Sequence, residues 1–217
     1  MKSRLIILAL FICSSQNLFS QQKLTKSEIL KEYQKNEVNP NIDSLYRWDI
    51  HLQTRKTFDE LLKSGIDTLL IYSVSYPGYH TKRDSCSTMY PIHSYFFGRT
   101  KDKSFYKAVN GICESVQGVS IDDEITRFAI ENYSKIKKEY FMGVITGAEK
   151  INNTLRLNEV WTDHEPKYSI LIFLNGDYKY LVFTEGDLTN RKSLFLHYNR
   201  RLISFKLFKL IEKELNK

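Results

Sequence analysis

Two short stretches of this sequence contain side chains that could carry out chemistry. The first stretch, residues 79–93, contains imidazole, carboxylate and thiol groups in His80, Asp84, Cys86 and His93. A thiol beside a histidine base would be a nucleophile, and two histidines with an aspartate could bind Zn²⁺ and leave one position open. The spacing matches no established ligand pattern, so a polar loop is the favoured interpretation and catalysis the alternative.

The second stretch places a histidine between two carboxylates, at Asp163, His164 and Glu165. Such a histidine could act as a general base with a raised pKa, or contribute to a metal site. Because adjacent side chains of an extended segment point in different directions, and Pro166 follows directly, we favour a hydrophilic turn. One site built from both stretches would require the fold to bring His80 and His164 together. We therefore predict no metal and no cofactor, and keep a small hydrolase or metal-dependent enzyme as the alternative.

Two cysteines, Cys86 and Cys113, remain once the N-terminal segment described below is removed. An even number of cysteines in an exported chain favours a disulfide, and no Cys-x-x-Cys spacing indicates a redox pair. We predict strands at 89–97 and 104–110 that form a hairpin around a turn at 98–103. In an antiparallel hairpin, the numbers of any two paired residues add up to the same total, so all pairs share one midpoint in the sequence. The midpoint between Cys86 and Cys113 falls within this turn. The sequence thus predicts a Cys86–Cys113 bond at the open end of the hairpin.

The N-terminal segment has the three parts of a secretory signal peptide. Lys2 and Arg4 form a basic start, an unbroken apolar run of nine residues follows at 5–13, and polar residues come next. Such a run is too short to cross the ~30 Å hydrocarbon core of a bilayer as a helix. We expect residues 1–20 to be removed by cleavage after Ser20. The mature chain is then exported, periplasmic or extracellular, and has no predicted membrane span.

Hydrophobic periodicity predicts the elements that must position these groups. A strand is expected at 67–76, and a hairpin at 168–185, where Asn175-Gly176 is a strong turn signal. Residues 155–161 are expected to pair beside that hairpin. Four helices are predicted. The first starts at a Thr25–Glu28 capping box, the second begins at 41–44 and ends at 63, and the other two cover 120–138 and 202–215.

Hairpins rather than βαβ units dominate this order of elements. We therefore expect an α+β fold, in which N-terminal, central and C-terminal helices pack on one face of a mainly antiparallel sheet. No segment rich in Pro, Gly or Ser interrupts the chain after the signal peptide. Residues 21–217 are accordingly predicted to form a single domain.

The composition and the missing motifs exclude several classes of protein. With 9 Gly and 4 Pro, the chain is neither collagen-like nor of low complexity, and its 14 Tyr and 13 Phe oppose wholesale disorder. The sequence contains no G-x-x-x-x-G-K-[ST] or G-x-G-x-x-G phosphate loop, no G-x-S-x-G nucleophile elbow and no H-E-x-x-H zinc motif. Several common reaction classes are therefore excluded, although enzymes in general are not.

The net charge of +7 is concentrated near the C-terminus. Residues 190–217 carry +6 and the signal peptide +2, whereas 21–189 carry −1. Because the body of the chain is not basic, we do not expect nucleic-acid binding. The basic tail is also apolar, so we favour a helix docked on its own domain, with contact to an anionic membrane or a partner as the alternative. The candidate binding residues in this tail are Arg191, Lys192, Arg200, Arg201, Lys206 and Lys209.

These observations favour an exported, non-enzymatic binding or interaction domain with a protein or small molecule as its partner. The supply of tyrosine and tryptophan supports this interpretation, since both side chains bury a large area and keep a polar tip. The alternatives are the exported enzyme described above and an envelope-associated protein that uses its basic C-terminal helix.

Overall fold

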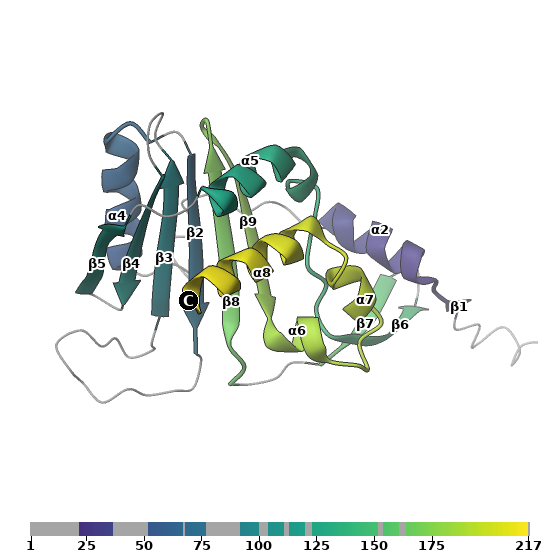
Figure 1. Cartoon of the computed structure of the whole chain (residues 1–217). Helices are drawn as coiled ribbons and strands as arrows, with labels where there is room; N and C mark the ends of the chain where they lie inside the picture. The colour runs from purple at the N-terminus through teal and green to yellow at the C-terminus, as the bar shows by residue number, and fades with distance from the viewer. Residues whose placement is uncertain are drawn as a thin grey trace, which may run out of the picture.

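The computed structural model shows two antiparallel sheets and the helices that cover them (Figure 1). The α+β fold class and the mainly antiparallel sheet are therefore confirmed. Among the described residues, no helix is both long enough and apolar enough to span a bilayer. The described residues are 22–36, 52–66, 68–76, 92–99, 104–110, 113–119, 123–151, 154–160 and 164–216.

The larger sheet has six strands in the order β5-β4-β3-β2-β8-β9, and every neighbouring pair is antiparallel. The central strand β2 joins two hairpins, because it pairs with β3 on one side and with β8 on the other. The strands are β2 (Thr68–Ser75), β3 (Ile92–Arg99), β4 (Ser104–Asn110), β5 (Cys113–Val119), β8 (Lys167–Leu174) and β9 (Asp177–Thr184).

The hairpin of β8 and β9 forms at the predicted position. Leu174 pairs with Asp177, so Asn175 and Gly176 make a two-residue turn. Their φ angles are 49° and 82°, the left-handed region that Asn and Gly tolerate best. The Asn-Gly sequence thus fixes the register of this hairpin.

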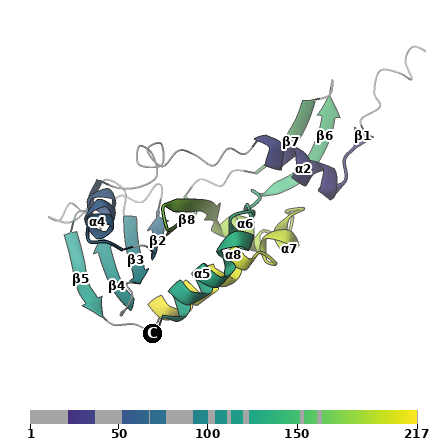
Figure 2. The same ribbon diagram turned by 90° about the horizontal axis from the view of Figure 1, so that it is seen from above.

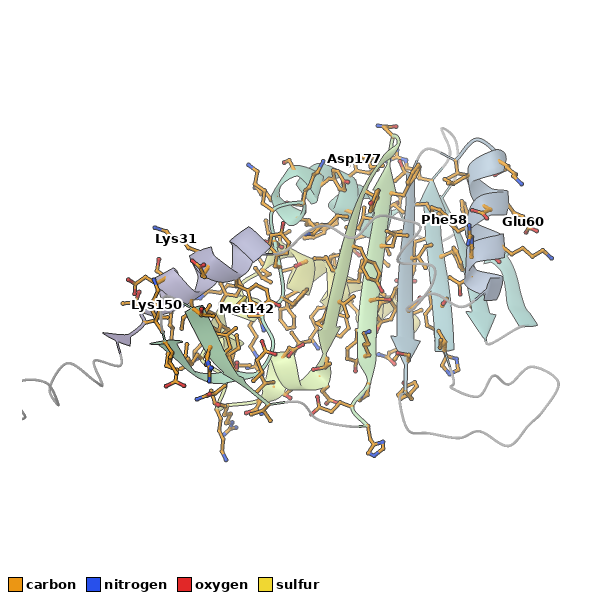
Figure 3. The ribbon with its side chains drawn as sticks, turned by 180° about the vertical axis from the view of Figure 1, so that it is seen from behind. Lys31, Phe58, Glu60, Met142, Lys150 and Asp177 are labelled. Atoms are coloured by element: carbon orange, nitrogen blue, oxygen red, sulfur yellow. The ribbon has the colours of Figure 1, made fainter. Side chains whose placement is uncertain are left out.

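Helices cover both faces of the larger sheet (Figure 2). The helices α5 (Glu124–Ile136) and α8 (Ile203–Leu215) lie side by side on one face, while α4 (Leu52–Lys63) lies on the other. Figure 3 shows Phe58 of α4 directed toward the sheet and Glu60 directed away from it. The expectation that the helices pack on one face is therefore wrong.

The physical reason lies in β2, which is apolar on both faces. Leu70 and Tyr72 point into the core under α5 and α8, whereas Leu69 and Ile71 point into the core under α4 with Phe58. All five side chains are at most 2% exposed. A strand buried on both sides needs a cover on each face, because leaving either row of side chains in water would lose hydrophobic stabilisation.

The smaller sheet has the order β1-β6-β7 and is covered by α2 (Lys26–Asn36). Its strands are β1 (Gln22–Lys23), β6 (Ile145–Ile151) and β7 (Thr154–Glu159). The expected pairing of 155–161 with the β8–β9 hairpin is wrong, because β7 pairs with β6 instead. Only two residues, 152 and 153, separate β6 from β7 in the sequence, a length typical of a hairpin turn.

One buried asparagine connects the two sheets. Asn199 lies at the end of α7 (Leu196–Asn199), and α7 follows α6 (Glu185–Thr189) in the chain. The Nδ2 of Asn199 donates to the backbone oxygens of Met142 at 2.7 Å and Asp187 at 2.9 Å. Its Oδ1 accepts from the Met142 backbone N–H at 2.9 Å. Met142 packs in the core of the smaller sheet, so these bonds attach that sheet to the end of the larger one.

The hairpin symmetry used to predict the disulfide is wrong. In the β3–β4 pair, Arg99 lies opposite Ser104 and His93 opposite Asn110, so the hairpin is centred two residues later than predicted. The chain then turns again, and Cys113 opens β5 opposite Asn110 rather than extending β4. Cys86 lies outside the described residues, so the bond itself stays a prediction.

Candidate binding cleft

A cleft of about 450 Å³ lies between α6 and α8, above the ends of β8 and β9. Its volume falls within the range of about 300–1,000 Å³ that is typical of small-molecule sites. In Figure 1, α8 crosses the sheet diagonally and α6 lies at its lower edge. The cleft is lined by Tyr168, Glu185, Leu188, Thr189, Arg200, Phe205, Phe208, Lys209 and Glu212.

The floor of the cleft is aromatic and tightly packed. The ring of Phe208 contacts those of Tyr168, Phe183 and Tyr72, with centroid distances of 5.2, 5.1 and 6.1 Å. The rings of Tyr72 and Tyr168 are nearly parallel, at 8°. The sheet register produces this stack, because Val74 pairs with Tyr168 and Tyr72 lies on the same face two residues away. Because Phe208, Phe183 and Tyr72 are at most 4% exposed, the apolar surface that a ligand can reach belongs mainly to the partly exposed rings of Tyr168 and Phe205.

A tyrosine positions one carboxylate of the cleft. The Tyr72 hydroxyl donates to Glu212 Oε1 at 2.5 Å, and Tyr72 is fully buried. Burial, and then the bond to the Glu212 carboxylate, raise the pKa of Tyr72 well above its usual range. Burial, followed by the negative charges of Glu185 and Glu212, raises the pKa of Tyr168 to about 12. Both hydroxyls therefore keep their protons near neutral pH.

Charges of both signs lie at the rim of the cleft. Arg200 Nε donates to the backbone oxygen of Leu188 at 2.8 Å, which fixes the plane of the guanidinium group. Lys209 Nζ lies 5.3 Å from the ring centre of Phe208. Within the described part of the chain, Glu185, Arg200 and Lys209 form no ion pair with another side chain. These three charges are therefore available to a ligand.

The α6 wall of the cleft is held by two carboxylates. The N–H of Thr184 donates to Asp187 Oδ2 at 2.7 Å, and Thr184 Oγ1 accepts from the Asp187 N–H, which completes a capping box. Glu165 accepts from the Gly186 N–H at 2.9 Å. Burial raises the pKa of Asp187. Glu165, a predicted catalytic residue, thus holds a helix end.

The other predicted catalytic residues in the described ranges do not converge on the cleft. His93 is the second residue of β3, is half-buried and packs edge-on against Tyr76, with 6.2 Å between ring centres. Burial lowers the pKa of His93, which favours the neutral ring. His164 is exposed and has a φ of 76° in the turn before β8. His80, Asp84 and Asp163 lie outside the described residues.

The two chemical stretches nevertheless join the same end of the sheet. Ser75, at the end of β2, pairs with Ile92 of β3 and with Lys167 of β8. Ile92 and Lys167, which are described, therefore lie about 10 Å apart on either side of β2. In the portions of the chain that the structure describes, no three His, Cys, Asp or Glu side chains form a metal-ligand cluster. Catalysis at this end stays a hypothesis.

The structure separates the basic tail into two groups of residues. Arg200 and Lys209 line the cleft, whereas Arg191, Lys192, Arg201 and Lys206 are exposed outside its lining. The apolar face of α8 is buried against the sheet through Leu207, Phe208 and Ile211. The C-terminal helix thus docks on its own sheet, as the favoured interpretation expected.

Sequence reasoning missed Tyr168, Glu185 and Glu212 as candidate binding residues. Glu212 carried a signal that could have identified it, since it lies four residues after Phe208 and one after Ile211, on the apolar side of α8. A carboxylate at such a position requires a polar partner, and Tyr72 supplies it. Glu185 carried no comparable signal.

The chain matches no known family model, no curated protein and no solved structure.

Proposed function

We propose that this protein is an exported, non-enzymatic binding domain whose ligand site is the cleft between α6 and α8. The observation that carries the proposal is the combination, in one cleft of about 450 Å³, of a packed aromatic floor with unpaired charges of both signs. Binding sites of small molecules combine a mainly apolar lining with a few polar groups that orient the ligand. Tyr168 contributes to both, because its ring packs in the floor and its hydroxyl keeps a proton.

The cleft can be tested by filling it. Thr189 is exposed on its α6 wall, so Thr189→Trp should occupy the cleft without burying new polar groups. Thr154 of β7 is also exposed and lies outside the lining, and Thr154→Trp is the matched control. Amide chemical shifts would be followed while anionic, cationic, zwitterionic and neutral small molecules are added to the mature protein.

We expect at least one class of compound to shift the amides of Leu188 and Lys209. The shifts should disappear in Thr189→Trp and persist in Thr154→Trp, because only the first substitution fills the cleft. Undisturbed amides at millimolar concentrations of every class would contradict the proposal. Equal binding by the two tryptophan variants would also contradict it.

The proposed export rests on the signal-like N-terminus and makes a mass prediction. Expression with an intact export pathway should give a mature chain that begins at Gln21, visible as the loss of residues 1–20 in an intact-mass spectrum. A full-length cytoplasmic product would oppose export.

The Cys86–Cys113 disulfide belongs to the same proposal. Cys113 lies two strands away from the start of β3, about 10 Å across the sheet. Cys86 precedes Ile92 by six residues, and six extended residues span at most about 20 Å, so the chain length permits the bond. Thiol labelling of the unfolded mature protein should modify no cysteine before reduction and two cysteines after it. Two labelled thiols without reductant would contradict the bond.

Contact with an anionic envelope surface is a second candidate, supported by exposed basic residues on α8 and just before it. Arg201, Lys206 and Lys213 are exposed and have no ion pair within the described residues. Because the apolar face of α8 is buried, the contact would be electrostatic and would weaken as salt increases. Co-sedimentation with anionic vesicles should fall at high salt, and it should also fall in a variant in which these three basic residues are replaced by glutamine. Equal binding to neutral vesicles would contradict it.

A further inference from the structure

We infer that the cleft between α6 and α8 selects a short apolar peptide with free termini, which rests on the binding role proposed above. The ligand carboxylate would bind at Arg200 and Lys209, the ammonium group at Glu185 and Glu212, and the apolar side chains on the partly exposed rings of Phe205 and Tyr168. All six of these residues line the cleft.

The carboxylate end is assigned from the two cations. Arg200 uses Nε to hold the Leu188 backbone oxygen, so its two terminal nitrogens keep the fork geometry that suits a carboxylate. Lys209 Nζ is held near the rings of Phe208 and Phe205, at 5.3 and 5.7 Å from their centres. Neither cation has an acidic partner among the described side chains. Both positive charges are thus placed but unneutralised.

The ammonium end is assigned from the two acids. Glu212 Oε1 accepts the Tyr72 hydroxyl, which orients the carboxylate and leaves its second oxygen as an acceptor. Glu185 is exposed at the start of α6 and forms no ion pair with another described side chain. Two acids and two bases give the lining no net charge.

The balance of charges favours a zwitterion over a simple ion. An anionic ligand that filled the cleft would lie against Glu185 and Glu212, and a cationic one would lie against Arg200 and Lys209. Because like charges placed together weaken binding, both kinds of ligand are disfavoured. A peptide with two free termini satisfies both pairs and places its side chains on the aromatic floor.

The test is a calorimetric titration at low salt of the mature protein with the tripeptide Leu-Phe-Leu. The same peptide with an acetylated N-terminus loses the ammonium group, and with an amidated C-terminus it loses the carboxylate. We expect each modification to weaken binding about tenfold or more. Equal affinity of the free and modified peptides would overturn the inference.

Single substitutions assign each terminus to its partner. Lys209→Gln should weaken binding of the free peptide about fivefold and leave binding of the amidated peptide unaffected. Glu185→Gln should also weaken binding of the free peptide about fivefold, and it should leave binding of the acetylated peptide unaffected. Lys213→Gln is the matched control, because it removes the same charge from the same helix outside the cleft lining. An equal loss in Lys213→Gln would show a general charge effect and overturn the assignment.

Failure of this inference can be separated from failure of the binding role. If Leu-Phe-Leu does not bind but another class of compound shifts the amides of Leu188 and Lys209, the peptide assignment is wrong and the binding cleft stands. If nothing shifts those amides, both are wrong. Thermal denaturation of each variant confirms that the fold is retained.

Discussion

Tyr72 is the residue whose protonation links the cleft to the stability of the fold. Burial raises its pKa, so the native state keeps a proton that the unfolded chain releases near pH 10. Its stabilising contribution is therefore complete below pH 10 and is lost as the pH rises further. Tyr95 and Tyr168 have raised pKa values from the same cause and act in the same direction.

Tyr72→Phe should change the alkaline stability in a predictable way. Above pH 10, the free energy of unfolding of the wild type should fall by about 1.4 kcal/mol per pH unit more than that of the variant, because the variant lacks one ionisable group. Urea denaturation at pH 8, 10 and 11 measures the difference. Parallel curves for both proteins would show that Tyr72 is not held protonated.

Gly186 is required because its neighbour is a carboxylate. A Cβ atom at Gly186 would lie 2.6 Å from Glu165 Oε2, so Gly186→Ala should displace Glu165 from the Gly186 N–H. We expect a loss of about 1–2 kcal/mol in the free energy of unfolding, the cost of breaking a charged hydrogen bond. Gly143→Ala is the control, since a Cβ there meets no atom within 4 Å. Equal stability of the two variants would contradict this role.

These residues show what a sequence can reveal about a site. Asp163, His164 and Glu165 attracted attention because three polar groups are adjacent, yet Glu165 satisfies a backbone N–H and His164 is exposed. The cleft instead combines Tyr168, Glu185 and Glu212, which lie far apart in the sequence and meet only through the sheet and α8. Sequence proximity therefore does not identify the residues that line the cleft.

At the scale of elements, local patterns predicted the strands and helices more reliably than their partners. The strand at 104–110, the Asn-Gly hairpin and the C-terminal helix form where alternation, turn residues and helical spacing placed them. β5 went unpredicted because its sequence, CESVQGV, has little apolar alternation. The pairing of β7 with β6 depends on tertiary neighbours, which periodicity does not encode.

The start of α8 provides an element-scale prediction, because its cap comes from a distant residue. Leu202 precedes the helix and offers no capping side chain, but both oxygens of Glu139 accept from the N–H groups of Ile203 and Ser204 at 2.8 Å. Glu139 thus satisfies two of the free donors and places a negative charge at the positive helix end.

Glu139→Gln should destabilise the protein by about 1 kcal/mol, because it removes the charge and one of the two acceptors. Glu131→Gln is the matched control, since Glu131 is exposed on α5 and also loses one negative charge. Thermal denaturation at neutral pH measures both. A larger loss in Glu131→Gln would indicate that net charge rather than capping determines the effect.

At the scale of the whole molecule, Asn199 makes three hydrogen bonds that connect the segments beside the two sheets. Its side chain is fully buried and bonds to Met142 at the smaller sheet and to Asp187 of α6 beside the larger one. Leu194 adds a backbone bond to Ile145 at 2.8 Å. The predicted single domain requires these contacts to make the sheets unfold together.

Asn199→Ala should therefore affect cooperativity as well as stability. Removal of the amide leaves the N–H and oxygen of Met142 and the oxygen of Asp187 without this partner in a buried site, which should cost about 3 kcal/mol. In hydrogen exchange, the amides of β6 should lose more protection than those of β2, because the smaller sheet loses its attachment while the larger core stays intact. Asn216→Ala, at the exposed end of α8, is the control and should change stability by only a few tenths of a kcal/mol. Equal loss of protection in β2 and β6 would instead show that the two sheets behave as one cooperative unit whose coupling does not depend on Asn199.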